Sequence, residues 1–444
     1  MHNEINQDAL ELIIQEVIKQ SLTSGADQVK VAVSHAIGFS VNARMSEVEN
    51  IEYTNGHGLS LTVLMDKKKG SASTTDLNKS SLSETIKKAC SFAKYTTKDE
   101  CSGLPEKSDM FKGEIKDLEL YHDWEISVEE ATQIAIECEA AALNLDPKIV
   151  NSEGASVSSN RSIHVYGDSH NFLNSEMRTS HSIGCVVLAG DKNEKQRDYW
   201  SSSSRHPDDL DNHLLVGKKA GERTLDRLGS KKIDTTEAPV LFSPKLSSGF
   251  INHAVQALSG GAQYREASFL LGAMGNRIFP EFLSIKERPH LLKGWRSSFY
   301  DGEGVGTYDR NIVQQGVIEG YFLDSYSARR LKMETTGNCG GAHNLIIPGN
   351  ISDQEAIIST MKRGLLVQEL IGQGVNNVTG DYSRGVAGFW IEDGKIVHPV
   401  HEVTISGNLL DLYQKISLIG NDYDHRSSTH CGALLVDNMR IAGN

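Results

Sequence analysis

The chain begins with apolar positions at helical spacing. Apolar residues at intervals of three and four follow Asp8, which predicts an amphipathic helix of about five turns that ends near Gly25. The apolar positions are Leu10, Ile13, Ile14, Val17 and Ile18. Short β-type runs come next, separated by turn signals at Asn55-Gly56 and at residues 67–70, and they predict an antiparallel meander. These runs are residues 28–34, 39–43 and 59–65.

Helical and β-type segments then arrive in clusters rather than in strict alternation. Helical patterns occupy residues 80–95, 128–143 and about 208–228. A β-type stretch covers residues 150–200, with turns expected at 158–160 and 167–168. Clustered elements are typical of the α+β class rather than of a doubly wound α/β sheet. We therefore predict an α+β protein.

A domain boundary is predicted near residues 229–238, which are polar, contain chain breakers and precede a strand-like run at Pro239–Phe242. The prediction is an N-terminal α+β domain at residues 1–235 and a C-terminal, glycine-rich and β-rich domain at residues 236–444. A chain of 444 residues is long enough for two cores. The dense glycines after residue 300 indicate tight turns between short strands.

The net charge, the cysteine spacing and the lengths of the apolar runs disfavour several classes of function. The formal net charge of −13 disfavours nucleic acid and anionic membranes as partners. Six cysteines without a C-x-x-C pair indicate neither a disulfide framework nor a zinc ribbon. The first residues do not resemble a secretory signal, and no apolar run reaches the length of a membrane span. We expect a cytoplasmic protein.

Local motifs for common chemistries are incomplete. The glycine-rich segments at 302–306 and 372–377 lack the pattern of a phosphate loop, so we interpret them as structural turns. Residues 380–385 resemble a nucleophile elbow, but Asp381 stands where that motif needs glycine. His398 and His401 flank Pro399, and in a strand residues three apart point to opposite faces. No local metal site follows from these residues.

The C-terminal half contains a set of longer motifs that resembles the PmbA/TldD family (peptidase family U62), and specifically its PmbA (TldE) branch. The resemblance covers residues 238–444, and the N-terminal half is similar mainly in the order of its elements. Its implied fold is a two-domain PmbA/TldD-like structure with mixed and antiparallel sheets. The matching motifs are residues 257–261, 290–294, 325–331, 336–341, 373–390 and 403–409.

The resemblance implies a two-subunit zinc peptidase in which the TldD-type subunit carries a His-Glu-x-x-x-His motif and a distant cysteine. In this chain the first ligand position falls on Asn252, the carboxylate on His253 and the second ligand on Ala257, while Cys431 matches the distant cysteine. A catalytic zinc needs three protein ligands and a nearby base. We therefore expect no catalytic residue, no cofactor and no metal in this chain, and zinc in a TldD-type partner.

The predicted function is that of a PmbA/TldE-type subunit of a TldD/TldE zinc metallopeptidase that acts on unfolded or extended peptides, in peptide maturation or antitoxin degradation. The expected assembly is a heterodimer with a TldD-type subunit, or a homodimer when the chain is alone. One alternative is an independent metallohydrolase with a rebuilt site at His253 and Cys431, to which His430 adds a nitrogen. Another is a binding or scaffold protein without enzymatic activity.

Overall fold

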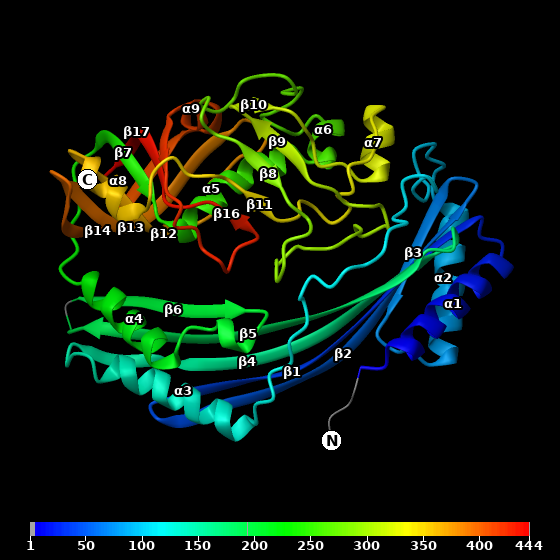
Figure 1. The fold of residues 1–444 in the computed structure, drawn as a ribbon, viewed down its shortest axis with the longest axis horizontal. Coiled ribbons are helices and arrows are strands. Elements are labelled where there is room, and N and C mark those ends of the chain that lie inside the picture. The colour runs from blue at the N-terminus through cyan, green and yellow to red at the C-terminus, as the bar shows by residue number, and fades with distance from the viewer. Residues whose placement is uncertain (1–4, 193, 444) are drawn as a thin grey trace.

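A computed structural model describes residues 5–192 and 194–443 of the chain. In this described part, the N-terminal half forms one six-stranded antiparallel sheet with the order β3-β2-β1-β4-β5-β6 (Figure 1). The strands are β1 (Gln28–Arg44), β2 (Glu47–Met65), β3 (Lys68–Thr74), β4 (Ile149–Asp168), β5 (Leu173–Gly190) and β6 (Lys195–Ser204).

Two pairs of helices cover the two ends of this long sheet (Figure 1). One core forms between β1, β2, β4 and the pair α1 (Gln7–Thr23) and α2 (Lys79–Tyr95). A second core forms between β1, β4, β5 and the pair α3 (Val128–Leu143) and α4 (His213–Asp226). The helix predictions at the N-terminus, at 80–95 and at 128–143 are confirmed. The helix predicted from 208 is shorter, because a 3-10 turn (Pro207–Asp209) precedes α4 and Asn212 caps its first turn.

The strands are longer than the sequence pattern predicts. The Asn55-Gly56 turn prediction is wrong, because both residues pair with β1 inside β2. Residues 158–160 are likewise inside β4 and pair with β1. At this crossing a Cβ on Gly38 would lie 2.5 Å from the backbone oxygen of Ser159, so the close approach of β1 and β4 requires glycine. The β2–β3 turn consists of Asp66 and Lys67, both with positive φ.

The C-terminal half, which is described without a gap from residue 236 to 443, contains two further sheets. One has the order β10-β9-β8-β11-β16, and the other has the order β14-β13-β12-β7-β17-β15. In the second sheet β7 is parallel to β12 and antiparallel to β17, and β14 also pairs with β17, so the sheet curls on itself. The strands are β7 (Thr236–Phe242), β8 (Ile285–Glu287), β9 (Arg310–Gln314), β10 (Val317–Ile318), β11 (Leu345–Ile346), β12 (Arg363–Ile371), β13 (Asp381–Glu392), β14 (Lys395–Asn408), β15 (Ile416–Ile419), β16 (Thr429–His430) and β17 (Leu434–Ala442).

The helix α5 (Pro244–Ala257) follows β7 directly and packs into the largest apolar core of the described chain. Phe250 is its central contact, because its ring stacks on Phe242 with 4.8 Å between centroids and meets the Tyr413 ring edge-on at 5.3 Å. The remaining helices of this half are short: α6 (Gly260–Tyr264), α7 (Ser325–Leu331), α8 (Gln354–Thr360) and α9 (Leu409–Gln414).

Guanidinium groups connect the two halves by bonding to backbone carbonyls. Arg205 donates to Trp295 O at 3.0 Å, and Arg178 donates to Ser297 O at 2.7 Å. In the opposite direction, Arg426 of the C-terminal half donates to Ser201 O of β6 at 2.5 Å. Figure 1 shows that the C-terminal half lies over the sheet on the side of β6. The division of the chain into domains at residue 235 stays a prediction.

The fold is α+β with antiparallel and mixed sheets, as predicted from the sequence. Among the described residues, no helix is both long and apolar enough to cross a lipid bilayer.

Candidate functional site

The zinc-motif positions lie on the C-terminal part of α5, which is a continuous α-helix. Residues five apart on such a helix differ by about 140° in direction, so Asn252 and Ala257 face different surroundings. Asn252 Oδ1 accepts a hydrogen bond from Thr429 Oγ1 at 3.0 Å. The Ala257 methyl is fully buried, and its carbonyl accepts bonds from Gln263 and Ser268 at 2.7 Å each. Both residues therefore make hydrogen bonds or packing contacts within the C-terminal half.

His253 lies between these positions and is largely buried. Its ring meets the Tyr382 ring edge-on, with 5.9 Å between centroids. Burial, and then the neighbouring Arg384 guanidinium, lower the pKa of His253, so its imidazole is neutral at pH 7. Its Nδ1 atom is buried without a hydrogen-bond partner among the described residues.

Cys431 is completely buried in the same core as α5. Burial raises the pKa of its thiol to about 12, although the neighbouring Ser247 hydroxyl acts in the opposite direction. A zinc ligand must be a thiolate, and this environment keeps the thiol neutral. The adjacent His430 points away from it, because its ring stacks on Tyr423 with 4.4 Å between centroids. A small apolar thiol fits this buried position, which gives Cys431 a packing role.

These side chains do not fit a catalytic zinc, because an amide, a neutral histidine, a methyl group and a buried thiol stand at the four positions. Within residues 5–192 and 194–443, no group of three or more His, Cys, Asp or Glu side chains is arranged to hold a metal ion. The ligands that a rebuilt site at His253 and Cys431 requires are therefore not assembled in the described part of the chain.

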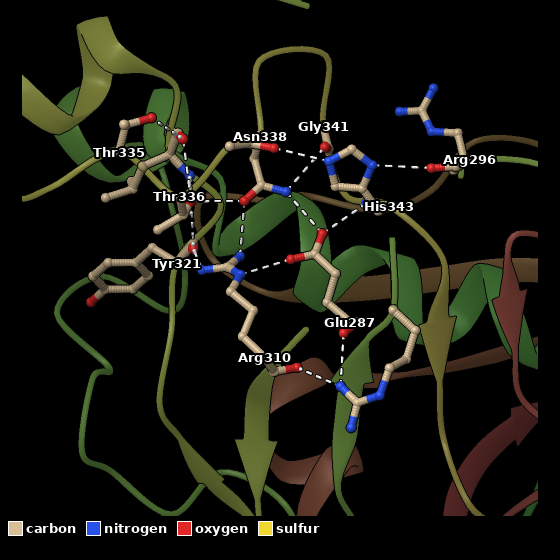
Figure 2. Close-up of polar contacts among 12 residues, drawn as sticks. Glu287, Arg296, Arg310, Tyr321, Thr335, Thr336, Asn338, Gly341 and His343 are labelled. Carbon is tan, nitrogen blue, oxygen red and sulfur yellow. Dashed lines mark hydrogen bonds and ion pairs between the residues drawn. The ribbon is translucent and has the colours of Figure 1, made fainter. Parts of the chain in front are cut away.

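The glycine-rich segment at residues 335–343 is held by a buried polar network (Figure 2). Arg310 donates to Glu287 at 2.7 Å, and Asn338 donates to the other Glu287 oxygen at 2.8 Å. The ring of His343 bridges two carbonyls, with Nδ1 3.0 Å from Arg296 O and Nε2 2.9 Å from Gly337 O. The backbone N–H of His343 also donates to Glu287 at 2.8 Å, and because Glu287 is 1 % exposed its carboxylate depends on these partners. Gly337, Gly340 and Gly341 in this segment have positive φ, a conformation that glycine adopts readily in tight turns.

The segment at residues 301–306 is also a turn rather than a phosphate loop. The Asp301 carboxylate accepts bonds from the backbone N–H groups of Glu303, Val305 and Cys339. Burial and the nearby Glu303 carboxylate raise the pKa of Asp301 to about 7. The resemblance to a nucleophile elbow at 380–385 also has no structural basis, because Ser383 is inside β13 and its N–H bonds to Gly374 O.

The sequence patterns did not reveal a cleft of about 720 Å³ between the two halves. One wall comes from Trp200 of β6, from Arg205 directly after this strand and from Lys219 of α4. The opposite wall comes from the first residues of α5, including Ser243 and Lys245, and from the loops at 291–295 and 422–430. A cleft of this size is within the range of ligand pockets, roughly 300–1,000 Å³. The run of four serines at 201–204 is a sequence signal for this wall, because serine is mostly exposed in proteins whereas Ser202 and Ser204 are buried.

Comparison with known proteins shows that three segments of this sequence match domains of one family. The PmbA/TldA metallopeptidase C-terminal domain matches residues 235–443, the central domain of the same family matches 121–228, and its domain 1 matches 29–93. Metalloprotease PmbA of Escherichia coli O157:H7 is 42% identical and aligns over 98% of this chain and 97% of its own length. The Metalloprotease PmbA homolog of Haemophilus influenzae is 42% identical, over 95% and 94% of the two chains.

Solved structures show the same fold. A protein of Bacteroides thetaiotaomicron, described as a candidate modulator of DNA gyrase, has a TM-score of 0.94 and 28% identity over 99% of this chain and 100% of its own. TldE of Thermococcus kodakarensis has a TM-score of 0.83 and 21% identity, over 97% and 100% of the two chains, which shows the fold alone. The three domain matches and the extended identity to PmbA proteins show that this chain belongs to the PmbA/TldD metallopeptidase family, in its PmbA branch.

Proposed function

We propose that this chain is the non-catalytic, TldE-type subunit of a zinc metallopeptidase whose active site belongs to a TldD-type partner. The main support is an observation on α5, where the Asn252 side chain makes an internal hydrogen bond and the Ala257 methyl group is packed in the core. The metalloprotease names of the relatives support a proteolytic context. In this proposal, zinc activates water in the partner.

The partner is proposed to be a related chain. A Metalloprotease TldD homolog of Buchnera aphidicola is 22% identical to this chain over 95% of its length, so the two branches are similar along nearly the whole sequence. Related chains can pair through equivalent surfaces, which also permits a homodimer when the partner is missing. The substrates are proposed to be unfolded or extended peptides, as in peptide maturation or antitoxin degradation, because an enclosed site excludes folded proteins.

The decisive experiment compares cleavage of an unstructured peptide by this chain alone, by a TldD-type chain from the same organism alone, and by the mixture. The expected result is cleavage only by the mixture, abolished by a chelator and restored by zinc. Size-exclusion chromatography with light scattering should show one complex containing both chains. A failure to form this complex would favour the scaffold alternative.

Metal content separates the proposal from an independent metallohydrolase. The purified chain should contain well under one zinc ion per molecule, and the Cys431→Ala variant should contain the same amount. Stoichiometric zinc that is lost in Cys431→Ala would contradict the proposal.

A further inference from the structure

The cleft between the two halves contains buried polar atoms without partners. Ser243 is 3 % exposed and Arg205 is 6 % exposed, and both line the cleft. Ser243 Oγ and Arg205 Nε form no hydrogen bond among the described residues. Because nearly all buried polar groups in proteins are bonded, two unsatisfied donors on one cleft indicate a missing partner that accepts hydrogen bonds.

Three cations of the cleft rest on aromatic rings instead of on carboxylates. Lys219 lies 3.9 Å from the centre of the Trp200 ring, and Lys245 lies 3.5 Å from that of Tyr199. Arg205 lies 4.9 Å from the Trp295 ring centre, and burial lowers its pKa to about 10. None of the three forms an ion pair within the described residues.

The carboxylates of the cleft are mostly engaged already. Asp424 pairs with Arg426 at 2.7 Å, and Asp209 pairs with Lys293 at 2.8 Å. Asp422 accepts bonds from backbone N–H groups. The two others, Asp211 and Glu355, are exposed to solvent. Six Lys and Arg side chains and five Asp and Glu side chains line the cleft, so cations slightly outnumber carboxylates here although the whole chain has a net charge of −13.

The beginning of α5 adds to this preference for an anion. Ser243 is the N-cap residue, yet its side chain makes no capping bond, so its hydroxyl is available to a ligand. The 14-residue helix directs the positive end of its dipole to the same place. The unpaired Ser243 Oγ and Arg205 Nε atoms are independent of the helix dipole, and they also indicate a ligand at this end of the helix.

The shape of the cleft favours an extended chain. β6 is the outermost strand of its sheet, and residues 201–204 line the cleft. An outer strand edge can bind an extended peptide through backbone hydrogen bonds. Arg426, which is paired with Asp424, already donates to the edge carbonyl of Ser201, so a bound peptide would pair with the strand edge beyond this residue.

We propose that this cleft binds an extended peptide and that a carboxylate of the peptide is held by the Ser243 hydroxyl and by cationic side chains that line the cleft, among them Lys219 and Lys245. The inference deepens the proposed function, because it gives the non-catalytic subunit a role in selecting carboxylate-bearing peptides. It concerns this chain alone, so a binding measurement without a TldD-type partner tests it separately from cleavage.

The test is isothermal titration of the full chain with four acetylated Ala-Ala-Ala-Ala-Glu peptides. One peptide is unmodified, one has a C-terminal amide, one has Gln in place of Glu, and one has both changes. We expect the peptide without a carboxylate to bind at least about tenfold more weakly than the unmodified one. The two singly changed peptides show whether the terminal or the side-chain carboxylate is recognised. Equal binding of all four peptides would overturn the proposal.

Variants locate the site. Lys219→Gln and Lys245→Gln should each weaken binding of the unmodified peptide about tenfold, and salt should weaken wild-type binding. Lys218→Gln is the matched control, because Lys218 is the preceding residue of α4, is exposed and pairs with Glu222 at 3.6 Å. Unchanged binding in Lys219→Gln and Lys245→Gln, or an equal loss in Lys218→Gln, would contradict the assignment.

Competition distinguishes a peptide site from a general anion site. Inorganic phosphate at matched ionic strength should not displace the unmodified peptide, and displacement at equal concentration would overturn the peptide assignment. If the mixture with a TldD-type chain cleaves peptides but this chain binds none, the proposed function stands and the inference fails. If this chain binds the peptide but the mixture cleaves nothing, the inference stands and the proposed function fails.

Discussion

The two ends of α5 differ in what surrounds them. At the C-terminal end, Asn252 is bonded to Thr429 and Ala257 is sealed in the core. At the N-terminal end, Ser243 is equally buried but faces a cleft and has no hydrogen-bond partner among the described residues. The difference indicates that the C-terminal end of the helix stabilises the fold, whereas the Ser243 hydroxyl at its N-terminus is available to a ligand. Substitutions at the two ends should therefore separate stability from binding.

The largest effect is expected for Phe250→Ala. Its ring is 1 % exposed and contacts Phe242, Tyr382 and Tyr413, so truncation leaves a large cavity. The free energy of unfolding should fall by about 4 kcal/mol. Denaturant unfolding measures this loss, and peptide affinity measured below the unfolding transition should remain at the wild-type value.

Ala257→His should cost about 2 kcal/mol of unfolding free energy. The variant restores one ligand type of the family motif, but the methyl group it replaces is fully buried and the larger ring overpacks the core. Thermal unfolding is the measurement, with Gln256→His on the exposed neighbouring position as the control. A variant as stable as the wild type, with zinc bound, would mean that this end of α5 still accommodates a metal ligand.

Asn252→Ala should cost about 1 kcal/mol, because the Thr429 hydroxyl, which is 3 % exposed, loses its acceptor. A double-mutant cycle with Thr429→Val isolates the pair by chemical denaturation. An interaction energy near zero would remove the structural role assigned to Asn252.

The smallest stability effect is expected for Ser243→Ala, at less than about 0.5 kcal/mol. An N-cap serine usually contributes more, but this one makes no capping bond. Its peptide affinity should nevertheless fall severalfold, because one donor to the carboxylate is lost. A large loss of stability with unchanged affinity would reverse the comparison between the two ends of the helix.

The helices could be predicted from the sequence because their signals are local. The span Val128–Leu143 was predicted with both ends, and the structure adds the capping box between Ser127 and Glu130. Strand ends were harder to predict. Asn55-Gly56 is a strong turn signal, yet pairing with β1 carries β2 through it. Tertiary hydrogen bonds outweighed the local preference of the dipeptide.

The assignment of Asn252, His253, Ala257 and Cys431 to the zinc-motif positions stays a prediction from the sequence. The sequence could not show that the Cys431 thiol is sealed in the core, since burial depends on contacts such as Ser247 on α5, which is 184 positions away. The cleft could not be predicted from the sequence either, because Trp200 and Lys219 belong to one half of the chain and Ser243 and Lys245 to the other.

The sequence by itself therefore determined the helices, the α+β class and the family, because each of these depends on neighbouring residues or on short motifs. Only the tertiary structure decided the lengths of the strands, the neutral state of Cys431 and the unsatisfied donors of the cleft. These properties depend on burial by residues that are distant in the sequence. A local pattern of residues does not show which distant groups come into contact.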